Sequence, residues 1–228
     1  MSIGDAEIKT QERVIRFFKD PESLGYQYIG NLSDYQNKNI KEDRLRQYLR
    51  LKGYADKLID AAVMQLQQEA GNLSRGVYDA NKTVYSRLKY GIPVSESPEK
   101  PPVTVELIDE ANPLNNDFAI AEEVTVVEQQ EKRPDLVIYL NGIAVAVIEL
   151  KRSSISVSEG IRQNLTNQKD SFIRGFFTTM QFCMAGNESE GLRYGTLLTG
   201  EKFYMEWKDD GFKEHEEERD PVDVRISK

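Results

Sequence analysis

The apolar residues of the first ninety positions recur at the three- and four-residue spacing of amphipathic helices. This spacing predicts helices over residues 7–19, 41–51 and 55–70, and a further helical stretch over 75–90. The helix predicted over 55–70 has one continuous apolar face, and Gly71 stands where a helix would end. That face consists of Leu58, Ile59, Ala62, Val63 and Leu66.

Apolar runs with little polar alternation dominate the second half of the chain and predict buried strands. The predicted strands are 26–30, 103–108, 118–127, 135–140, 143–150, 194–199 and 203–207. Helical spacing returns near 157–168 and near 171–184. The stretch SESPEKPP at 95–102 predicts a loop or hinge between the helical part and the sheet. Strands followed by helices in this way indicate an α/β fold.

The segment RPDLVIYLNGIAVAVIELK joins two of these strands through Asn141-Gly142, a strong signal for a two-residue hairpin turn. Such a turn pairs Leu140 with Ile143 and, in a regular hairpin, leaves Asp135 and Glu149 on opposite faces of the sheet. If the two carboxylates act together, the hairpin must contain an odd-length loop or a bulge near the strand ends, and bulges are common beside active sites. We therefore predict one of these irregularities between residues 135 and 149.

Asp135, Glu149 and Lys151 bring two carboxylates and an ammonium group to one end of this hairpin. Carboxylates at the ends of apolar strands are costly to bury without a cation or a hydrogen-bonding partner. Mg²⁺ prefers oxygen ligands and often takes only one or two of them from protein carboxylates. Lys151 could then orient a water or stabilise charge on a phosphoryl group. The competing interpretation is a strand-end salt bridge, because so short a motif also occurs by chance.

The sequence that follows supports the first interpretation. Ser156 and Glu159 have the spacing of a helix capping box, and Gln163 and Asn167 fall on one face of the helix that begins there. With the RPD, the Asn-Gly turn, the ELK and the later RYGTLLTGEKFYMEW, the chain resembles the N-terminal nuclease domain of type I restriction enzyme R (motor) subunits. These domains belong to the PD-(D/E)xK nuclease superfamily. The resemblance covers roughly residues 7–208.

This resemblance implies a role for each residue of the hairpin end. Asp135 and Glu149 would bind the metal together with the backbone carbonyl of Leu150, and Lys151 would be the catalytic lysine. Two further positions are implied on helices: Glu12 as an acidic residue that approaches the metal, and Gln163 as a catalytic residue. A solvated helix surface is the alternative for both. Asn167 stands where the family usually has tyrosine.

The resemblance also implies the architecture and the domain limits. The expected fold is a restriction-endonuclease-like α/β core, with a central mixed sheet flanked by helices and a helical insertion over about 36–94. The nuclease domain would span 1–208, and 209–228 would be a charged linker toward a motor region that this chain lacks. No GxxxxGK[ST] phosphate-binding loop occurs, so ATP would act only through that motor region.

Composition narrows the remaining function classes. One cysteine and one histidine exclude a disulfide framework and a Cys/His zinc site. The absence of an apolar run of about 18 residues predicts no membrane partner, and a cytoplasmic location is expected. The net charge of −8 is unusual for a DNA-binding protein, but residues 201–228 account for −4 of it. Residues 149–175 carry five basic and three acidic side chains, so we expect weak DNA binding by the isolated chain.

The function that these features predict is a Mg²⁺-dependent DNA endonuclease domain, with Mn²⁺ as a substitute metal. In enzyme terms it would be part of a type I site-specific deoxyribonuclease. Its partners would be double-stranded DNA and the methyltransferase and specificity subunits of a restriction complex, since sequence recognition belongs to another subunit in this family. Two alternatives stay open: a catalytically inactive docking domain of the same fold, and a DNA repair or recombination nuclease of the superfamily.

Overall fold

The computed structural model of the chain describes residues 3–97 and 99–208, and its side chains from residue 8 onward within those ranges. The charged linker expected over 209–228 lies outside the described residues. None of the described helices is long and apolar enough to cross a membrane. The helices are α1 (Ile3–Lys19), α2 (Glu42–Leu51), α3 (Asp56–Gly71), α4 (Val77–Tyr90) and α5 (Val157–Asn167), with short 3₁₀ helices η1 (Pro113–Asn115), η2 (Arg174–Thr179) and η3 (Glu201–Phe203).

A seven-stranded mixed sheet forms the centre of the molecule, as the α/β prediction requires. In spatial order its strands are β1 (Gln27–Asn31), β4 (Phe118–Glu122), β7 (Leu136–Leu140), β8 (Ile143–Leu150), β9 (Phe182–Asn187), β10 (Gly191–Gly195) and β11 (Met205–Glu206). The pairs β1–β4 and β8–β9 are parallel, and the other neighbours are antiparallel. Two small hairpins accompany it: β2 (Ile92–Val94) with β3 (Val103–Val105), and β5 (Val126–Val127) with β6 (Glu131–Lys132).

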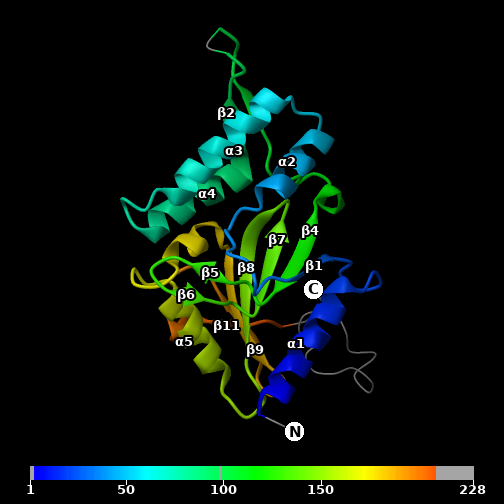
Figure 1. The fold of residues 1–228 in the computed structure, drawn as a ribbon, viewed down its shortest axis with the longest axis vertical. Helices are drawn as coiled ribbons and strands as arrows, with labels where there is room; N and C mark the ends of the chain where they lie inside the picture. The colour runs from blue at the N-terminus through cyan, green and yellow to red at the C-terminus, as the bar shows by residue number, and fades with distance from the viewer. Residues whose placement is uncertain (1–2, 98, 209–228) are drawn as a thin grey trace.

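Helices lie against both faces of the sheet, and α1 and α5 flank the strands (Figure 1). Helix α1 packs against apolar side chains of one face, among them Ile120, Leu136, Ile148 and Met184. The opposite face carries Val137, Tyr139, Val147 and Cys183, which pack against Phe176 and Phe177 of η2. Helix α5 lies on this second face and contacts both β8 and β9. The chain thereby has the flanked central sheet of a restriction-endonuclease-like fold.

Helices α2, α3 and α4 pack together at the end of the molecule that also carries the β2–β3 hairpin (Figure 1). Their shared core includes all five residues of the apolar face predicted for α3, and it reaches Ile143 at the start of β8. The predicted strand at 103–108 was wrong in its placement: only Val103–Val105 is a strand, and it pairs with β2 instead of joining the central sheet. Because Val94 pairs with Val103, the chain between these residues connects the two strands of this hairpin.

The helix predicted over 171–184 was also wrong. Its first part forms the six-residue η2, and the chain then enters the sheet as β9, parallel to β8. The regular spacing of phenylalanines indicated a helix because Phe176 and Phe177 are indeed core residues. However, β8 is a central strand in which every residue except Val145 is buried. Its second edge needs a partner, and the crossover through α5 supplies one. Long-range pairing therefore overrides the local pattern.

The β7–β8 hairpin contains the irregularity that the sequence predicted. Asn141 and Gly142 have φ values of +52° and +82°, as in a two-residue type I′ turn. Tyr139 pairs with Ala144, but Ile138 pairs with Ala146, so Val145 is an extra residue in β8. The prediction of a bulge is confirmed, although the bulge lies nearer the turn than the strand ends.

Gly142 offers a test of how tightly this turn is held. A Cβ at Gly142 would lie 2.7 Å from the Lys41 carbonyl oxygen and 2.8 Å from the Leu45 nitrogen. Gly53 has a similar φ of +86° but open space around it. Each alanine replacement carries about 1–2 kcal/mol of left-handed strain. We expect Gly142→Ala to lower the free energy of unfolding by at least about 2 kcal/mol more than Gly53→Ala, measured by urea denaturation. Equal losses would show that α2 yields to the added methyl group.

Candidate metal and nuclease site

The bulge places Asp135 and Glu149 on the same face of the sheet. Because Leu136 pairs with Ile148, the next residues outward, Asp135 and Glu149, stand opposite each other at the strand ends. Both lie on the face that α5 covers. The Leu150 backbone N–H donates a 2.7 Å hydrogen bond to Asp135 Oδ2, which fixes the orientation of that carboxylate. Two carboxylates that a regular hairpin would separate are thus brought together.

Glu149 is fully buried at this position. Its Oε2 accepts a 2.6 Å hydrogen bond from Gln163 Nε2, whereas Oε1 accepts none from the residues that the structure describes. Burial raises the pKa of Glu149 well above its ordinary value, and the charge of Asp135 raises it further, while the charge of Lys151 opposes both. Asp135 can hydrogen-bond to Glu149 only when one of the two carboxyls is protonated. Without a proton or a cation, the pair is electrostatically unfavourable.

Lys151 follows directly from β8 and lies beside this pair. Its Nζ donates a 3.1 Å hydrogen bond to the carbonyl oxygen of Leu150, the oxygen that the family resemblance assigns to the metal. The side chain is half-buried, and its charge acts on Glu149. The ammonium group of Lys151 therefore lies beside the carbonyl oxygen and the carboxylates of this site.

Helix α5 brings Gln163 to the carboxylates. The Ser156 hydroxyl caps the helix by accepting from the Ser158 N–H, but Glu159 pairs with Arg162 instead of completing the predicted capping box. Gly160 allows the close approach, because a Cβ there would lie 2.9 Å from the Ala185 Cβ and 3.4 Å from the Glu149 Cβ. The sequence analysis missed Gly160, although a glycine inside a helix is itself a signal of close packing.

Two asparagines complete the buried side of α5. Asn164 is fully buried and donates a 2.8 Å hydrogen bond to the Met184 carbonyl, which ties α5 to β9. Asn167, at the position where the family usually has tyrosine, is 2% exposed near the end of the helix. Its amide is therefore not presented to solvent, and a direct contact to a substrate is not available from this position.

Glu12 is not brought to the carboxylate pair, because α1 covers the opposite face of the sheet and Glu12 is exposed on it. Its neighbour Gln11 is buried instead, and its Nε2 donates to Glu122 Oε2 at 3.0 Å and to Glu123 Oε1 at 3.2 Å. Glu123 was missed by the sequence analysis, yet its charge contributes to the raised pKa of Glu149. Its φ of +51° is left-handed, which is uncommon for a residue other than glycine.

The donor set fits a hard divalent cation. It consists of two carboxylates and a backbone carbonyl, and Glu149 Oε1 is a buried oxygen without a donor among the described residues. The described part of the chain contains no cluster of three or more acidic, histidine or cysteine side chains that could hold a metal. Two protein carboxylates supplemented by water are, however, the usual arrangement for Mg²⁺, whereas zinc sites need nitrogen or sulfur ligands.

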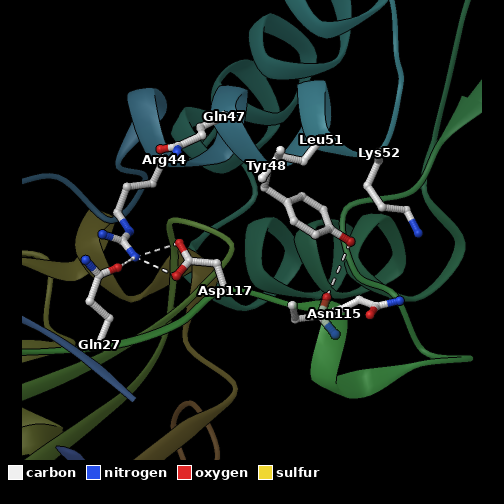
Figure 2. Close-up of a pocket in the computed structure, with 9 residues that line it drawn as sticks. Gln27, Arg44, Gln47, Tyr48, Leu51, Lys52, Asn115 and Asp117 are labelled. Carbon is white, nitrogen blue, oxygen red and sulfur yellow. Dashed lines mark hydrogen bonds and ion pairs between the residues drawn. The ribbon is translucent and has the colours of Figure 1, made fainter. Parts of the chain in front are cut away.

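A separate pocket of about 480 Å³ lies at the other end of the strands, between α2 and the residues that precede β4 (Figure 2). Arg44 Nη2 donates 2.6 Å hydrogen bonds to both carboxylate oxygens of Asp117 and to Gln27, and Tyr48 contacts Asn116. These polar groups bind one another and so join the helical layer to the sheet. Their arrangement is that of an internal network of hydrogen bonds.

Comparison with known families gives one match across most of the chain. The sequence profile described as the type I restriction enzyme R protein N terminus matches residues 7–203. The match includes every residue of the candidate site, namely Asp135, Glu149, Leu150, Lys151 and Gln163, and it also includes Glu12.

Individual proteins match over shorter stretches. The "Putative type I restriction enzyme MjaIXP endonuclease subunit" of Methanocaldococcus jannaschii is 33% identical over 97 residues, which is 39% of this chain and 9% of that protein. The type I restriction enzyme SsaAORF53P endonuclease subunit of Staphylococcus saprophyticus is 29% identical over 112 residues, 47% of this chain and 12% of that protein. The matched stretches are thus a small fraction of these relatives.

Proposed function

The chain belongs to the family of type I restriction enzyme R protein N termini, and on this premise we propose that it is the Mg²⁺-dependent DNA-cleaving domain of such an enzyme. It would hydrolyse phosphodiester bonds without reading a sequence of its own. The bulged hairpin supports this proposal most strongly, because it turns two distant acidic residues into a pair. Such a pair is unfavourable in a purely structural role.

In the proposed function, Asp135, Glu149 and the Leu150 carbonyl hold the metal. The chemistry that a bound Mg²⁺ supplies is Lewis acidity toward a phosphoryl oxygen and toward water. Lys151 adds a positive charge at the same place, where it stabilises the charge that develops on the phosphate. The 2.6 Å hydrogen bond from Gln163 to Oε2 limits rotation of the Glu149 carboxylate and thereby fixes the position of Oε1, which accepts no hydrogen bond from the described residues. Asp135 is held in the same way by the Leu150 N–H.

For the substrate and the partners, we propose those expected for a restriction enzyme of this family. Double-stranded DNA would be the substrate, and the methyltransferase and specificity subunits of a restriction complex would be the partners. ATP would act only through a motor region, and Mn²⁺ would replace Mg²⁺. A repair or recombination nuclease would lack gene neighbours that encode a methyltransferase and a specificity subunit, so the genomic context separates that alternative.

Thermal unfolding tests the metal site independently of cleavage. We expect Mg²⁺ or Mn²⁺ at about 100 times its dissociation constant to stabilise the wild-type chain by about 2.7 kcal/mol. For a chain of this size that is a rise in Tm of about 5–11 °C. Asp135→Asn should abolish the rise, because it removes one of the two carboxylate charges. The variant should still fold, because the asparagine oxygen can accept the hydrogen bond from the Leu150 N–H.

The matched control is Glu122→Gln, which removes one charge from a neighbouring strand end where Glu122 accepts from Tyr28 and Gln11. This variant should keep the metal-dependent rise. A wild-type chain whose Tm does not respond to either metal would favour the inactive docking domain.

A further inference from the structure

Arg133 lies two residues before Asp135, and its guanidinium group is partly exposed beside the strand ends. Nε forms a 2.9 Å ion pair with Glu123 Oε2, while the side chain is 56% exposed. The ion pair uses the inner nitrogen of the guanidinium. The two terminal nitrogens, which form the fork that binds planar anions in two places, have no acceptor among the described residues.

Three other arginines near the sheet use these terminal nitrogens for ion pairs within the protein. Arg162 binds Glu159 and Glu201 through both of them, and Arg174 binds Asp170. Arg193 forms an ion pair with Glu206 through Nη1. Arg133 therefore differs from them in presenting its outer edge to solvent beside the candidate site.

Glu123 holds Arg133 in this position. Its carboxylate is fixed by Gln11 as well as by Arg133, and its backbone N–H donates a 2.8 Å hydrogen bond to the Asp135 carbonyl. The left-handed backbone of Glu123 carries a cost that the surrounding structure must offset, and strain of this kind concentrates at functional sites. The strand ends of β4 and β7 are thus joined through this residue.

The charge balance at the strand ends calls for such a cation. Three acidic side chains, Asp135, Glu149 and Glu123, lie at these strand ends beside the basic side chains of Lys151 and Arg133. A polyanion approaching this edge meets net repulsion unless exposed cations neutralise its phosphates. Lys151 is already directed to the Leu150 carbonyl, so a phosphate beside the reacting one needs a different partner.

We propose that Arg133 binds a backbone phosphate of the DNA next to the phosphate that is cleaved, with Glu123 as the residue that positions its guanidinium. This inference rests on the proposed function, because it takes DNA as the substrate. It assigns to Arg133 a contact with the substrate and no part in the chemical step.

The experiment measures binding of the wild-type 228-residue chain to a fluorescent DNA duplex in EDTA, which prevents cleavage, over a series of salt concentrations. We expect weak binding that falls steeply as salt rises. Arg133→Gln should raise Kd at least about five-fold at low salt and reduce the salt slope by about one. Arg133→Lys keeps the charge but not the fork, so it should raise Kd while leaving the slope nearly unchanged.

Arg50→Gln is the matched control. Arg50 pairs with Asp56 through Nε at the same 2.9 Å and is 57% exposed, but it lies on α2 in the helical layer. Both pairs are surface pairs whose loss should change stability by less than about 1 kcal/mol, so folding is preserved. We expect the control to bind DNA like the wild type.

Two other outcomes would contradict the inference on Arg133. If the wild type binds DNA but Arg133→Gln changes neither Kd nor the slope, or changes them no more than Arg50→Gln, the inference is wrong and the proposed function stands. If the wild-type chain shows no salt-dependent DNA binding even at the lowest salt, the inference and the proposed DNA substrate are both wrong.

Discussion

Lys151→Ala is expected to lower DNA cleavage by the assembled restriction enzyme by about 10²- to 10³-fold, the usual effect of removing one preorganised group that stabilises charge on a reacting oxygen. Lys151 Nζ donates a hydrogen bond to the Leu150 carbonyl, beside the two carboxylates that would hold the metal. The loss should appear in plasmid nicking and linearisation. If the chain acts beside a motor region, as proposed, ATP hydrolysis and DNA translocation by that region should persist, because Lys151 lies in the strand-end site and this chain contains no GxxxxGK[ST] loop.

Two sets of variants separate the role of Lys151 from a general effect of charge. Asp135→Ala and Glu149→Ala should cause a similar loss of cleavage and should also weaken metal binding. Lys57→Ala removes the same charge from an exposed position on α3 and should cut DNA normally. Normal cleavage by Lys151→Ala would show that the nuclease assignment of this site is wrong.

Glu149→Gln is expected to stabilise the metal-free chain at neutral pH. The pKa of Glu149 is raised above its ordinary value of 4.5, mostly by burial and to a smaller extent by the charge of Asp135. As pH rises through 4.5, the unfolded chain loses this proton while the folded chain keeps it, so the free energy of unfolding falls until the pH passes the folded pKa. Glutamine imitates the protonated acid and escapes this loss, which is about 1.4 kcal/mol for each unit of raised pKa.

The measurement is urea denaturation in EDTA between pH 4 and 8, followed by the same series in Mg²⁺. The wild type should become less stable than Glu149→Gln as pH rises in EDTA, and Mg²⁺ should stabilise only the wild type. Glu42→Gln is the contrasting control. Hydrogen bonds from Arg46 and Gln67 lower the pKa of Glu42, so its replacement should lose stability at neutral pH, by less than about 1 kcal/mol at this surface position. A wild type more stable than Glu149→Gln in EDTA at pH 7 would contradict the unfavourable carboxylate pair.

The elements that the sequence determined are those with a local physical cause. Helices α2 and α3 follow from apolar faces at helical spacing, and their observed bounds differ from the predicted ones by about one residue. The β7–β8 hairpin follows from two apolar runs around an Asn-Gly turn whose left-handed backbone these residues tolerate. The need for a bulge could also be deduced, since side-chain direction alternates along a strand and chemistry required Asp135 and Glu149 on one face.

Other features were decided by contacts between segments distant in sequence. The strand β9 forms from a stretch with helical phenylalanine spacing because β8 needs a partner on its second edge. The prediction of Glu12 as an acidic residue near the metal depended on which face α1 covers, and periodicity along one helix contains no information about its partner. The same limit applied to Glu123, whose importance arises only because β4 lies beside β7.

The sequence by itself thus predicted which residues meet at the strand ends: Asp135, Glu149 and Lys151, together with Gln163 on the helix that follows. Only the tertiary structure decided that Val145 is the bulged residue and that Gly160 lets α5 approach close enough for Gln163 to reach Glu149. Residue types and their spacing determine local conformational preferences, which a segment can adopt without contacts to distant parts of the chain. Burial of Glu149 and the direction of each neighbouring side chain depend on packing between layers, which exists only in the folded molecule.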